Sequence, residues 1–304
     1  LVRRFLDHGH DVVLLVGGGT GVIGDPGGKE NERQLLSLET IAGNKVALAA
    51  QVTQLFSGKE FTLVDNYDWL KDVSVLEFLR DVGKYFSMSQ LVQRDFIATR
   101  IGEGGAGISY AEFSYTLLQG YDFWHLHTHH DVNLQVGGSD QWGNILSGIE
   151  LIRKKNGDTA YGMTAPLVIN KSTGRKFGKS EGGAVWLDPA KTSVYKFYQF
   201  WLNTDDESVI DYMKLFTLLD KPTIEQIAAE QAAAPHTRVA QKRLAREITT
   251  LVHGEARARA AEHATEILFG GEVFDPTDEQ VVAVLQTELP VTRQGQTVVD
   301  ALID

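Results

Sequence analysis

A short basic segment has the residue types needed to act on a phosphorylated substrate. Two lysines three residues apart, Lys176 and Lys179, are followed at once by Ser180. The preceding residues, 170–175, are polar and include a glycine, which is typical of a loop. Positive charge beside a hydroxyl suits a triphosphate, because negative charge on the departing phosphates rises during transfer. A lysine run that is merely solvated is the alternative, and the segment alone does not decide between the two.

A glycine-rich turn follows the first predicted strand. Residues 16–29 read VGGGTGVIGDPGGK and place Gly19, Gly21 and Gly24 at the spacing of the dinucleotide-binding fingerprint. That fingerprint requires a helix to begin within it, whereas Asp25 and the Pro-Gly-Gly after it favour a loop. We therefore interpret the match as accidental. A loop at the carboxyl edge of a parallel strand can still bind a ligand, and Asp25 could hold an ammonium group. A turn that Asp25 merely caps is the alternative.

Three polar side chains share one face of a predicted helix. Tyr115, Gln119 and Asp122 are spaced i, i+4 and i+7 among apolar residues, so they fall within an arc of roughly 60°. Burying a carboxylate is costly unless it has partners. The stripe is therefore either a water-exposed face or the wall of a polar pocket. An aromatic amino acid would offer both a phenol and an ammonium group to such a pocket.

A second glycine pair lies where a predicted buried strand passes into a helix, in residues 135–144, QVGGSDQWGN. Asp140 is expected to cap that helix, and the glycines would let a nucleoside approach the end of the strand. No Walker-type lysine follows either glycine run, which excludes a P-loop. The histidines between residues 125 and 130 lack the spacing of a metal site, so no metal is expected there.

Short apolar runs alternate with longer helical stretches up to about residue 194, and these elements must position the candidate residues. Strands are predicted at residues 12–16, 61–64, 132–136 and 166–169, and helices at 41–56, 74–86, 110–125 and 140–155. The strands are nearly continuous in apolar residues and bounded by Gly, Asp or Asn, as buried parallel strands are. The alternation predicts an α/β fold with a doubly wound parallel sheet.

Only helices are predicted after residue 194, at residues 208–219, 223–233, 237–253 and 255–269. The second of these is expected to begin with a capping box formed by Thr223 and Gln226. The third carries four bases on one face, which is either solvated or in contact with RNA: Arg238, Lys242, Arg243 and Arg246. Beyond residue 270 the chain is acidic and loosely patterned, like a linker.

Length and composition limit the class of protein. A chain of 304 residues is long enough for two domains. Its formal net charge of −11 argues against a non-specific nucleic-acid binder, but not against one local basic surface. Cysteine is absent, which excludes disulfides and thiolate metal sites. No apolar run approaches the roughly 20 residues that span a bilayer, so no membrane association is expected and a cytoplasmic location is the default.

Taken together, these segments resemble the bacterial-type tyrosyl-tRNA synthetases, a family of class I aminoacyl-tRNA synthetases. Five segments occur in the order and spacing of that family: residues 16–29, 65–69 (DNYDW), 113–122 (FSYTLLQGYD), 135–144 and 176–180 (KFGKS). The resemblance implies a Rossmann-like catalytic domain over residues 1–194, a helical anticodon-side domain over 195–270 and a linker over 271–304. It also implies activation of L-tyrosine by ATP with Mg²⁺, transfer to tRNA(Tyr), no tightly bound cofactor, and a homodimer with Tyr110 near the interface.

The resemblance also assigns roles to individual residues. Those implied to hold the tyrosine ammonium group, or to lie near it, are Thr20, Asp25, Asn66, Tyr115 and Gln119. Asp122 is the implied acceptor of the phenol hydroxyl, while Gln135 and Gln141 line the amino-acid and adenylate site. Gly138 and Asp140 are implied ribose contacts. Lys176, Lys179 and Ser180 match the KMSKS-type loop that grips the pyrophosphate, and Lys29 and Arg33 match basic residues near the same phosphates.

Two departures from the family pattern bear on activity. The family's H-x-G-H signature and a phenol-binding tyrosine are absent from residues 1–304, as is a C-terminal RNA-binding domain. We therefore expect the chain to be a core fragment, and residues 1–304 alone to be inactive in adenylate formation. Two other interpretations stay open. A tryptophanyl-type synthetase is one, although it would not need Asp122 to accept from a phenol, and a non-catalytic RNA-binding relative is the other.

Overall fold

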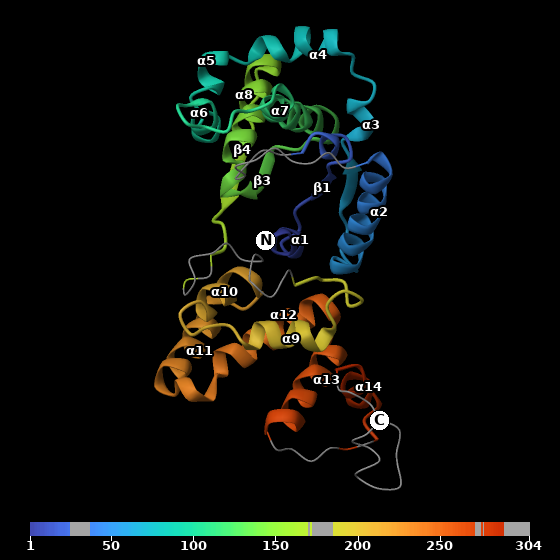
Figure 1. The fold of residues 1–304 in the computed structure, drawn as a ribbon, viewed down its shortest axis with the longest axis vertical. Helices are drawn as coiled ribbons and strands as arrows, with labels where there is room; N and C mark the ends of the chain where they lie inside the picture. The colour runs from blue at the N-terminus through green and yellow to red at the C-terminus, as the bar shows by residue number, and fades with distance from the viewer. Residues whose placement is uncertain (25–36, 170, 172–184, 271–274, 276, 289–304) are drawn as a thin grey trace. The chain divides into compact units, whose positions relative to one another are not determined.

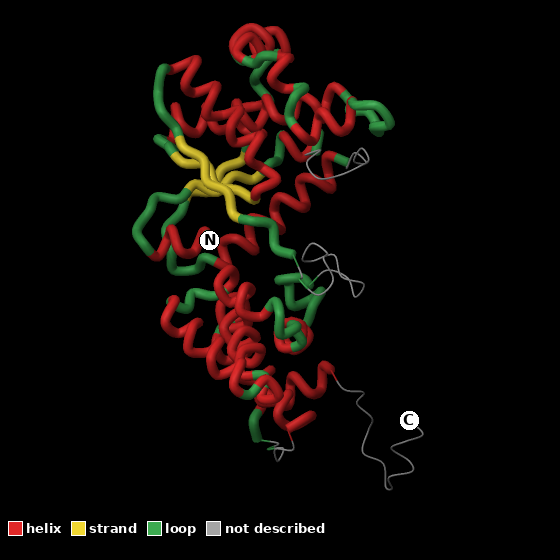
Figure 2. Tube along the Cα trace, turned by 90° about the vertical axis from the view of Figure 1, so that its left-hand side faces the viewer, coloured by secondary structure: helices red, strands yellow, loops and turns green. Residues whose placement is uncertain are grey.

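The computed structural model describes residues 1–24, 37–169, 171, 185–270, 275 and 277–288. The chain divides into two compact units, residues 2–168 and residues 169–304. Within the described ranges every strand lies in the first unit, and the second is helical (Figure 2). The predicted class, an α/β sheet followed by a helical part, is therefore confirmed. The finer division, with boundaries after residues 194 and 270, stays a prediction.

Parallel strands joined by helical connections form the centre of the first unit (Figure 1). β1 (Val13–Val16) pairs with β2 (Thr62–Asp65), and β3 (Leu134–Gly138) pairs with β4 (Tyr161–Ala165). In the chain, α2 (Leu38–Leu55) connects the first pair and α8 (Trp142–Asn156) connects the second. Because paired parallel strands end at the same edge, Val16 lies beside Asp65, and Gly138 lies beside Ala165.

The segment between β2 and β3 is helical and ends with α7 (Tyr110–His130), which carries the predicted polar stripe. α7 begins at a capping box in which Ser109 and Glu112 exchange hydrogen bonds. It continues past the predicted end at residue 125 to His130 and ends where Asp131 adopts a left-handed conformation and its amide donates to the Leu126 carbonyl oxygen. The other short elements of this unit are α1 (Val2–Asp7), η1 (Thr20–Val22), α3 (Tyr67–Leu70), α4 (Val75–Asp81), η2 (Gly83–Tyr85), α5 (Met88–Leu91), α6 (Asp95–Ile101) and η3 (Ser139–Gln141).

One predicted strand is wrong. Residues 12–16, 61–64 and 132–136 coincide closely with β1, β2 and β3, but the last strand occupies Tyr161–Ala165 rather than residues 166–169. Pro166 has no amide hydrogen to donate to a strand ladder. The strand therefore ends before Pro166, and the pairing with β3 uses the five residues on its N-terminal side.

The second unit consists of helices that pack around buried aromatic and aliphatic side chains. Its described helical elements are α9 (Val194–Leu202), α10 (Val209–Phe216), α11 (Lys221–Ala233), η4 (Pro235–Thr237), α12 (Val239–His253), α13 (Glu255–Thr265), η5 (Glu266–Gly270) and α14 (Glu279–Glu288). Phe197, Trp201 and Leu244 are among its most buried residues. The predicted capping box of Thr223 and Gln226 is wrong, because α11 begins earlier, at Lys221, and Asp220 accepts the Thr223 amide at 3.0 Å.

Most of the basic face predicted on α12 is engaged within the helical unit. Arg238 donates to the carbonyl oxygen of Leu202 at 2.7 Å. The two arginines further along α12 pair with carboxylates, Arg243 with Glu247 at 2.7 Å and Arg246 with Glu262 at 3.8 Å. This observation favours a structural role for these arginines over RNA contact. Within the described ranges, no helix is both long and apolar enough to cross a membrane.

His253 makes the helical unit sensitive to acid. It ends α12, is 8% exposed, and its ring lies edge-on to that of Phe197 at 4.8 Å. Neither ring nitrogen has a hydrogen-bond partner within the described part of the chain. Burial, with the nearby charge of Arg257, lowers the pKa of His253 to about 4. Between about pH 6.5 and pH 4, therefore, the imidazole of His253 stays largely neutral in the folded protein but becomes protonated in the unfolded chain.

We expect the stability of the wild-type protein to fall as the pH drops from about 6.5 toward 4. The sign follows because the folded-state pKa is the lower one, so the unfolded chain binds more protons in this window. The His253→Leu variant places an apolar side chain in the same buried position and has no titratable group there. It should therefore lose less stability over the same pH range. Thermal unfolding of both proteins at several pH values measures the difference. Equal losses would show that His253 does not titrate as described.

Candidate functional site

Asn66 joins the glycine-rich turn to α7. It follows β2 directly and is completely buried. Its side-chain oxygen accepts the Gly19 amide at 2.7 Å, and its side-chain nitrogen donates to Thr20 Oγ1 at 2.8 Å and to Asp122 Oδ2 at 2.9 Å. Three of the predicted site residues, Thr20, Asn66 and Asp122, are thus brought into one hydrogen-bonded group at the carboxyl ends of β1 and β2.

Asp65, the last residue of β2, anchors the same turn. Its carboxylate accepts the amides of Gly18 and Tyr67, each at 3.0 Å, and forms an ion pair with Lys45 of α2. Burial acts to raise the pKa of Asp65, but the hydrogen bonds from Lys45, Tyr67 and Gly18 outweigh it and leave the pKa lowered. A Cβ at Gly18 would lie 2.3 Å from Asp65 Oδ1, so only glycine permits this close approach.

Asp122 is a buried carboxylate held by neutral donors. It is 1% exposed, and besides Asn66 its partner is Trp69, whose indole Nε1 donates to Oδ1 at 2.8 Å. Burial is the largest influence and raises the pKa of Asp122 to about 6. The hydrogen bonds from Asn66 and Trp69 act to lower this pKa, whereas the negative charge of Asp65 acts to raise it. A carboxylate offers about four acceptor positions. The hydrogen bonds from Asn66 and Trp69 therefore leave part of the acceptor capacity of Asp122 unused.

Tyr115 and Gln119 precede Asp122 by two turns and one turn of α7. Both are half-buried, whereas Asp122 is buried. Of the two interpretations that the sequence left open, a fully water-exposed face is therefore excluded for this stripe. The remaining one, the wall of a polar pocket, agrees with the burial of its carboxylate.

The glycines at the end of β3 lead into a single 3-10 turn before α8 begins. Asp140 lies exposed in that turn and does not cap α8, so the predicted cap is wrong. The N-cap residue of α8 is Gln141, whose side chain makes no capping hydrogen bond. Gln141 Oε1 instead accepts from Asn144 at 3.2 Å. Gln135, further back on β3, has a buried side-chain oxygen for which the described residues offer no hydrogen-bond partner. Such an unpaired acceptor is costly to keep unless a ligand or water uses it.

Comparisons with known proteins agree with this arrangement. A family described as tRNA synthetases class I (W and Y) matches residues 1–270. The chain is 50% identical over 277 residues to a tyrosine–tRNA ligase of Limosilactobacillus reuteri, covering 90% of this chain and 66% of that protein. It is 47% identical over 312 residues to tyrosine–tRNA ligase 2 of Bacillus cereus, covering 100% of this chain and 73% of that protein.

A solved structure gives the same relationship. The C-terminally truncated mitochondrial tyrosyl-tRNA synthetase of Aspergillus nidulans is similar with a TM-score of 0.77 and 32% identity, over 87% of this chain and 78% of that one. The chain belongs to the bacterial-type tyrosyl-tRNA synthetases. It spans about two thirds to three quarters of the length of the two bacterial ligases, 66% and 73%.

Several residues predicted to act in this synthetase lie outside the described residues. They are Asp25, Lys29, Arg33, Lys176, Lys179 and Ser180. The described part of the predicted site therefore consists of the group around Asn66 and Asp122, the α7 stripe, and the end of β3. The binding roles of all these residues stay predictions.

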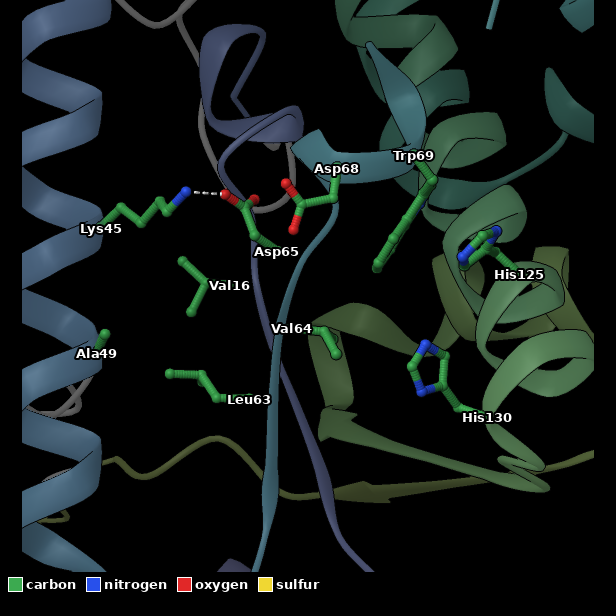
Figure 3. Close-up of a pocket in the computed structure, with 10 residues that line it drawn as sticks. All are labelled: Val16, Lys45, Ala49, Leu63, Val64, Asp65, Asp68, Trp69, His125 and His130. Carbon is green, nitrogen blue, oxygen red and sulfur yellow. Dashed lines mark ion pairs between the residues drawn. The ribbon is translucent and has the colours of Figure 1, made fainter. Parts of the chain in front are cut away.

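A pocket of about 550 Å³ is lined by residues of α2, β1, β2, α3 and α7 of the synthetase (Figure 3). Its apolar floor is made by Val16, Leu63 and Val64, and its polar wall includes Lys45, Asp65 and Asp68. Trp69 and His125 line it as a stacked pair. In the part of the chain that the structure describes, no group of three or more His, Cys, Asp or Glu side chains is arranged to hold a metal ion.

Proposed function

We propose that this synthetase activates L-tyrosine with ATP, forming tyrosyl-adenylate and pyrophosphate, and then transfers the tyrosyl group to tRNA(Tyr). The observation that carries the proposal is the buried Asp122 carboxylate, which is held by neutral donors and, among the residues that the structure describes, forms no ion pair. Such a group suits a ligand that brings a hydroxyl into an apolar, aromatic surrounding. The bacterial relatives that the chain matches at 50% and 47% identity are tyrosine–tRNA ligases, which favours tyrosine over the tryptophanyl alternative.

The amino-acid end of the site would be formed by residues that the family resemblance assigns. In this proposal Asp25, Tyr115 and Gln119 hold the ammonium group, and Gln135 and Gln141 line the adenylate site. Thr20 and Asn66, for which the resemblance implies a place near the ammonium group, are buried and hydrogen-bonded with Asp122, so we assign them to the phenol end instead. The half-buried positions of Tyr115 and Gln119 on the helix of Asp122 support this arrangement, as does the unpaired oxygen of Gln135.

The nucleotide end would act through charge. The tyrosine carboxylate is itself the nucleophile that attacks the α-phosphate, so no protein nucleophile is required. Lys176, Lys179 and Ser180 would stabilise the departing pyrophosphate, with Lys29 and Arg33 nearby, and Gly138 and Asp140 would contact the ribose. The exposure of Asp140 leaves its carboxylate available to a ribose hydroxyl. Mg²⁺ would enter bound to ATP as part of the substrate, in the cytoplasm where charged tRNA is used.

Tyrosine-dependent exchange of pyrophosphate into ATP by the full-length protein tests the proposal. We expect exchange with tyrosine and none with tryptophan. Exchange that depends on tryptophan instead would show that tryptophan, and not tyrosine, is the substrate. A folded protein that binds tRNA without any amino-acid-dependent exchange would instead favour a non-catalytic relative.

We further propose that the synthetase forms a homodimer through the α4, α5 and α7 region. Each of these three helices exposes at least one large apolar side chain: Val75 (75%) and Leu76 (80%) on α4, Met88 (60%) on α5 and Tyr110 (72%) on α7. Exposed apolar patches of this kind mark interaction surfaces, and a homodimer buries the same patch twice by symmetry.

The variant Leu76→Asp should weaken dimerisation by on the order of 100-fold or more, because each interface would bury two unpaired carboxylates. Sedimentation equilibrium measures the change in the dissociation constant. Phe269→Asp is the matched control, since Phe269 is similarly exposed (77%) but lies in the helical unit. A Leu76→Asp variant as dimeric as the wild type would place the interface elsewhere.

A further inference from the structure

The hydrogen bond between Trp69 and Asp122 depends on the orientation of one ring. Trp69 lies on α3, a single helical turn of four residues, and its side chain is only half-buried. An indole has one N–H group, so it can donate only along one direction in the ring plane. The contact of 2.8 Å to Asp122 Oδ1 is therefore lost if the ring tilts. A single helical turn is marginal by itself, so something else must fix the ring.

His125 supplies that support. Its ring lies face to face with the indole of Trp69, with the ring centroids 4.3 Å apart and the planes 17° from parallel (Figure 3). His125 follows Asp122 by three residues on α7, so one helix carries both the acceptor and the ring that stacks on its donor. The stack therefore ties the direction of the indole N–H to the helix that bears Asp122.

His125 is neutral at the pH at which the enzyme would work. Burial, with the nearby His129 and His130, lowers the pKa of His125 to about 4. A neutral imidazole stacks on an indole as a flat aromatic surface. A flat hydrocarbon ring at the same position should therefore preserve the function of His125, which gives the inference a sharp test.

We propose that His125 is a positioning residue for tyrosine recognition, which acts through Trp69 to keep the indole N–H on Asp122. The inference rests on the proposed function, in which Asp122 accepts the phenol hydroxyl. Without the indole bond, the Asp122 carboxylate would lose one of two donors that hold its orientation and favour its charged form. It would then accept less well from a phenol, while a substrate without a hydroxyl would be unaffected.

The expected effect is moderate and specific. The loss of a stacked aromatic pair typically changes an equilibrium constant by about 2- to 10-fold. The His125→Ala variant should therefore lower kcat/KM for tyrosine by about that factor, mainly through KM. The KM for ATP and the kcat/KM for phenylalanine should not change. His125→Phe, which keeps a flat ring, should restore the wild-type value for tyrosine. His127→Ala should remain close to wild type, because His127 contacts Val132 and Asp158 instead.

A spectroscopic measurement reports the hydrogen bond directly. The indole N–H resonance of Trp69, assigned by its loss in Trp69→Phe, should move toward the position of a free indole in His125→Ala and stay in place in His125→Phe. The inference is overturned if His125→Ala leaves both the resonance and the tyrosine-to-phenylalanine ratio unchanged. It is also overturned if the variant weakens both amino acids equally, or if His125→Phe is as impaired as His125→Ala.

Asp122→Ala, measured beside these variants, separates the two levels of the proposal. If Asp122→Ala also leaves the ratio unchanged, the proposed role of Asp122 fails and the role of His125 fails with it. If Asp122→Ala collapses the ratio and His125→Ala does not alter it, only the positioning role of His125 is wrong.

Discussion

The Asp122→Ala variant should lose most of the preference for tyrosine over phenylalanine. A site built around a hydroxyl group leaves its own buried acceptor unpaired when phenylalanine binds, and that unpaired group costs binding energy. Asp122 fits this role because it is 1% exposed and its known partners are both neutral donors. The reference case for such discrimination is tyrosyl-tRNA synthetase itself, with a ratio of about 10⁵, and we take the magnitude from there.

The measurement is kcat/KM for activation of each amino acid by pyrophosphate exchange in the full-length protein. Asp68→Ala is the matched control, because Asp68 is an exposed carboxylate lining the neighbouring pocket. We expect the control to keep the wild-type ratio. Since Asn66 and Trp69 both donate to Asp122, the alanine variant also leaves two donors without their acceptor, so circular dichroism must verify that it is folded. A folded variant with an unchanged ratio would refute the role of Asp122.

The fold was predictable where hydrophobic pattern and turn residues agree. β1, β2 and β3 are short apolar runs that end at Gly or Asp, and each was found within two residues of its predicted position at either end. β4 was missed because Gly162 and Thr164 interrupt the apolar residues of Tyr161–Ala165, whereas residues 166–169 form a continuous apolar run to which the strand was assigned. Its place is set by pairing with β3, which is a tertiary effect that no local pattern reports.

Of the candidate site, the sequence indicated some residues that lie together but not the hydrogen bonds that connect them. The sequence placed Thr20, Asn66 and Asp122 in one site, and the structure joins them by hydrogen bonds. Two further members, Lys45 and Trp69, were missed. A single lysine or tryptophan has no periodicity or spacing that marks it, and Trp69 meets Asp122 across 53 residues of chain. The segment DNYDW was the one available signal, because it lies in the family's order directly after β2.

Replacement of Lys179 by alanine should slow adenylate formation by about 10²–10³-fold, the usual effect of removing one group that stabilises developing negative charge. Lys179 lies outside the described residues, so the expectation rests on its spacing from Lys176 and on the family resemblance. The charge on the departing pyrophosphate grows as the transition state forms. A lysine that meets this charge contributes little to the binding of tyrosine, which is neutral overall and binds at the other end of the site.

The two predictions therefore separate in kinetics. Asp122→Ala should raise the KM for tyrosine, whereas Lys179→Ala should lower kcat and leave the dissociation constant of tyrosine nearly unchanged. Single-turnover formation of tyrosyl-adenylate, with tyrosine affinity from equilibrium binding, distinguishes the two effects. Lys171→Ala is a matched control, because Lys171 is ion-paired with Asp211 within the helical unit and its loss should leave the rate near wild type. A Lys179→Ala variant that binds tyrosine poorly but reacts at the normal rate once saturated would assign this lysine to substrate binding rather than to transition-state stabilisation.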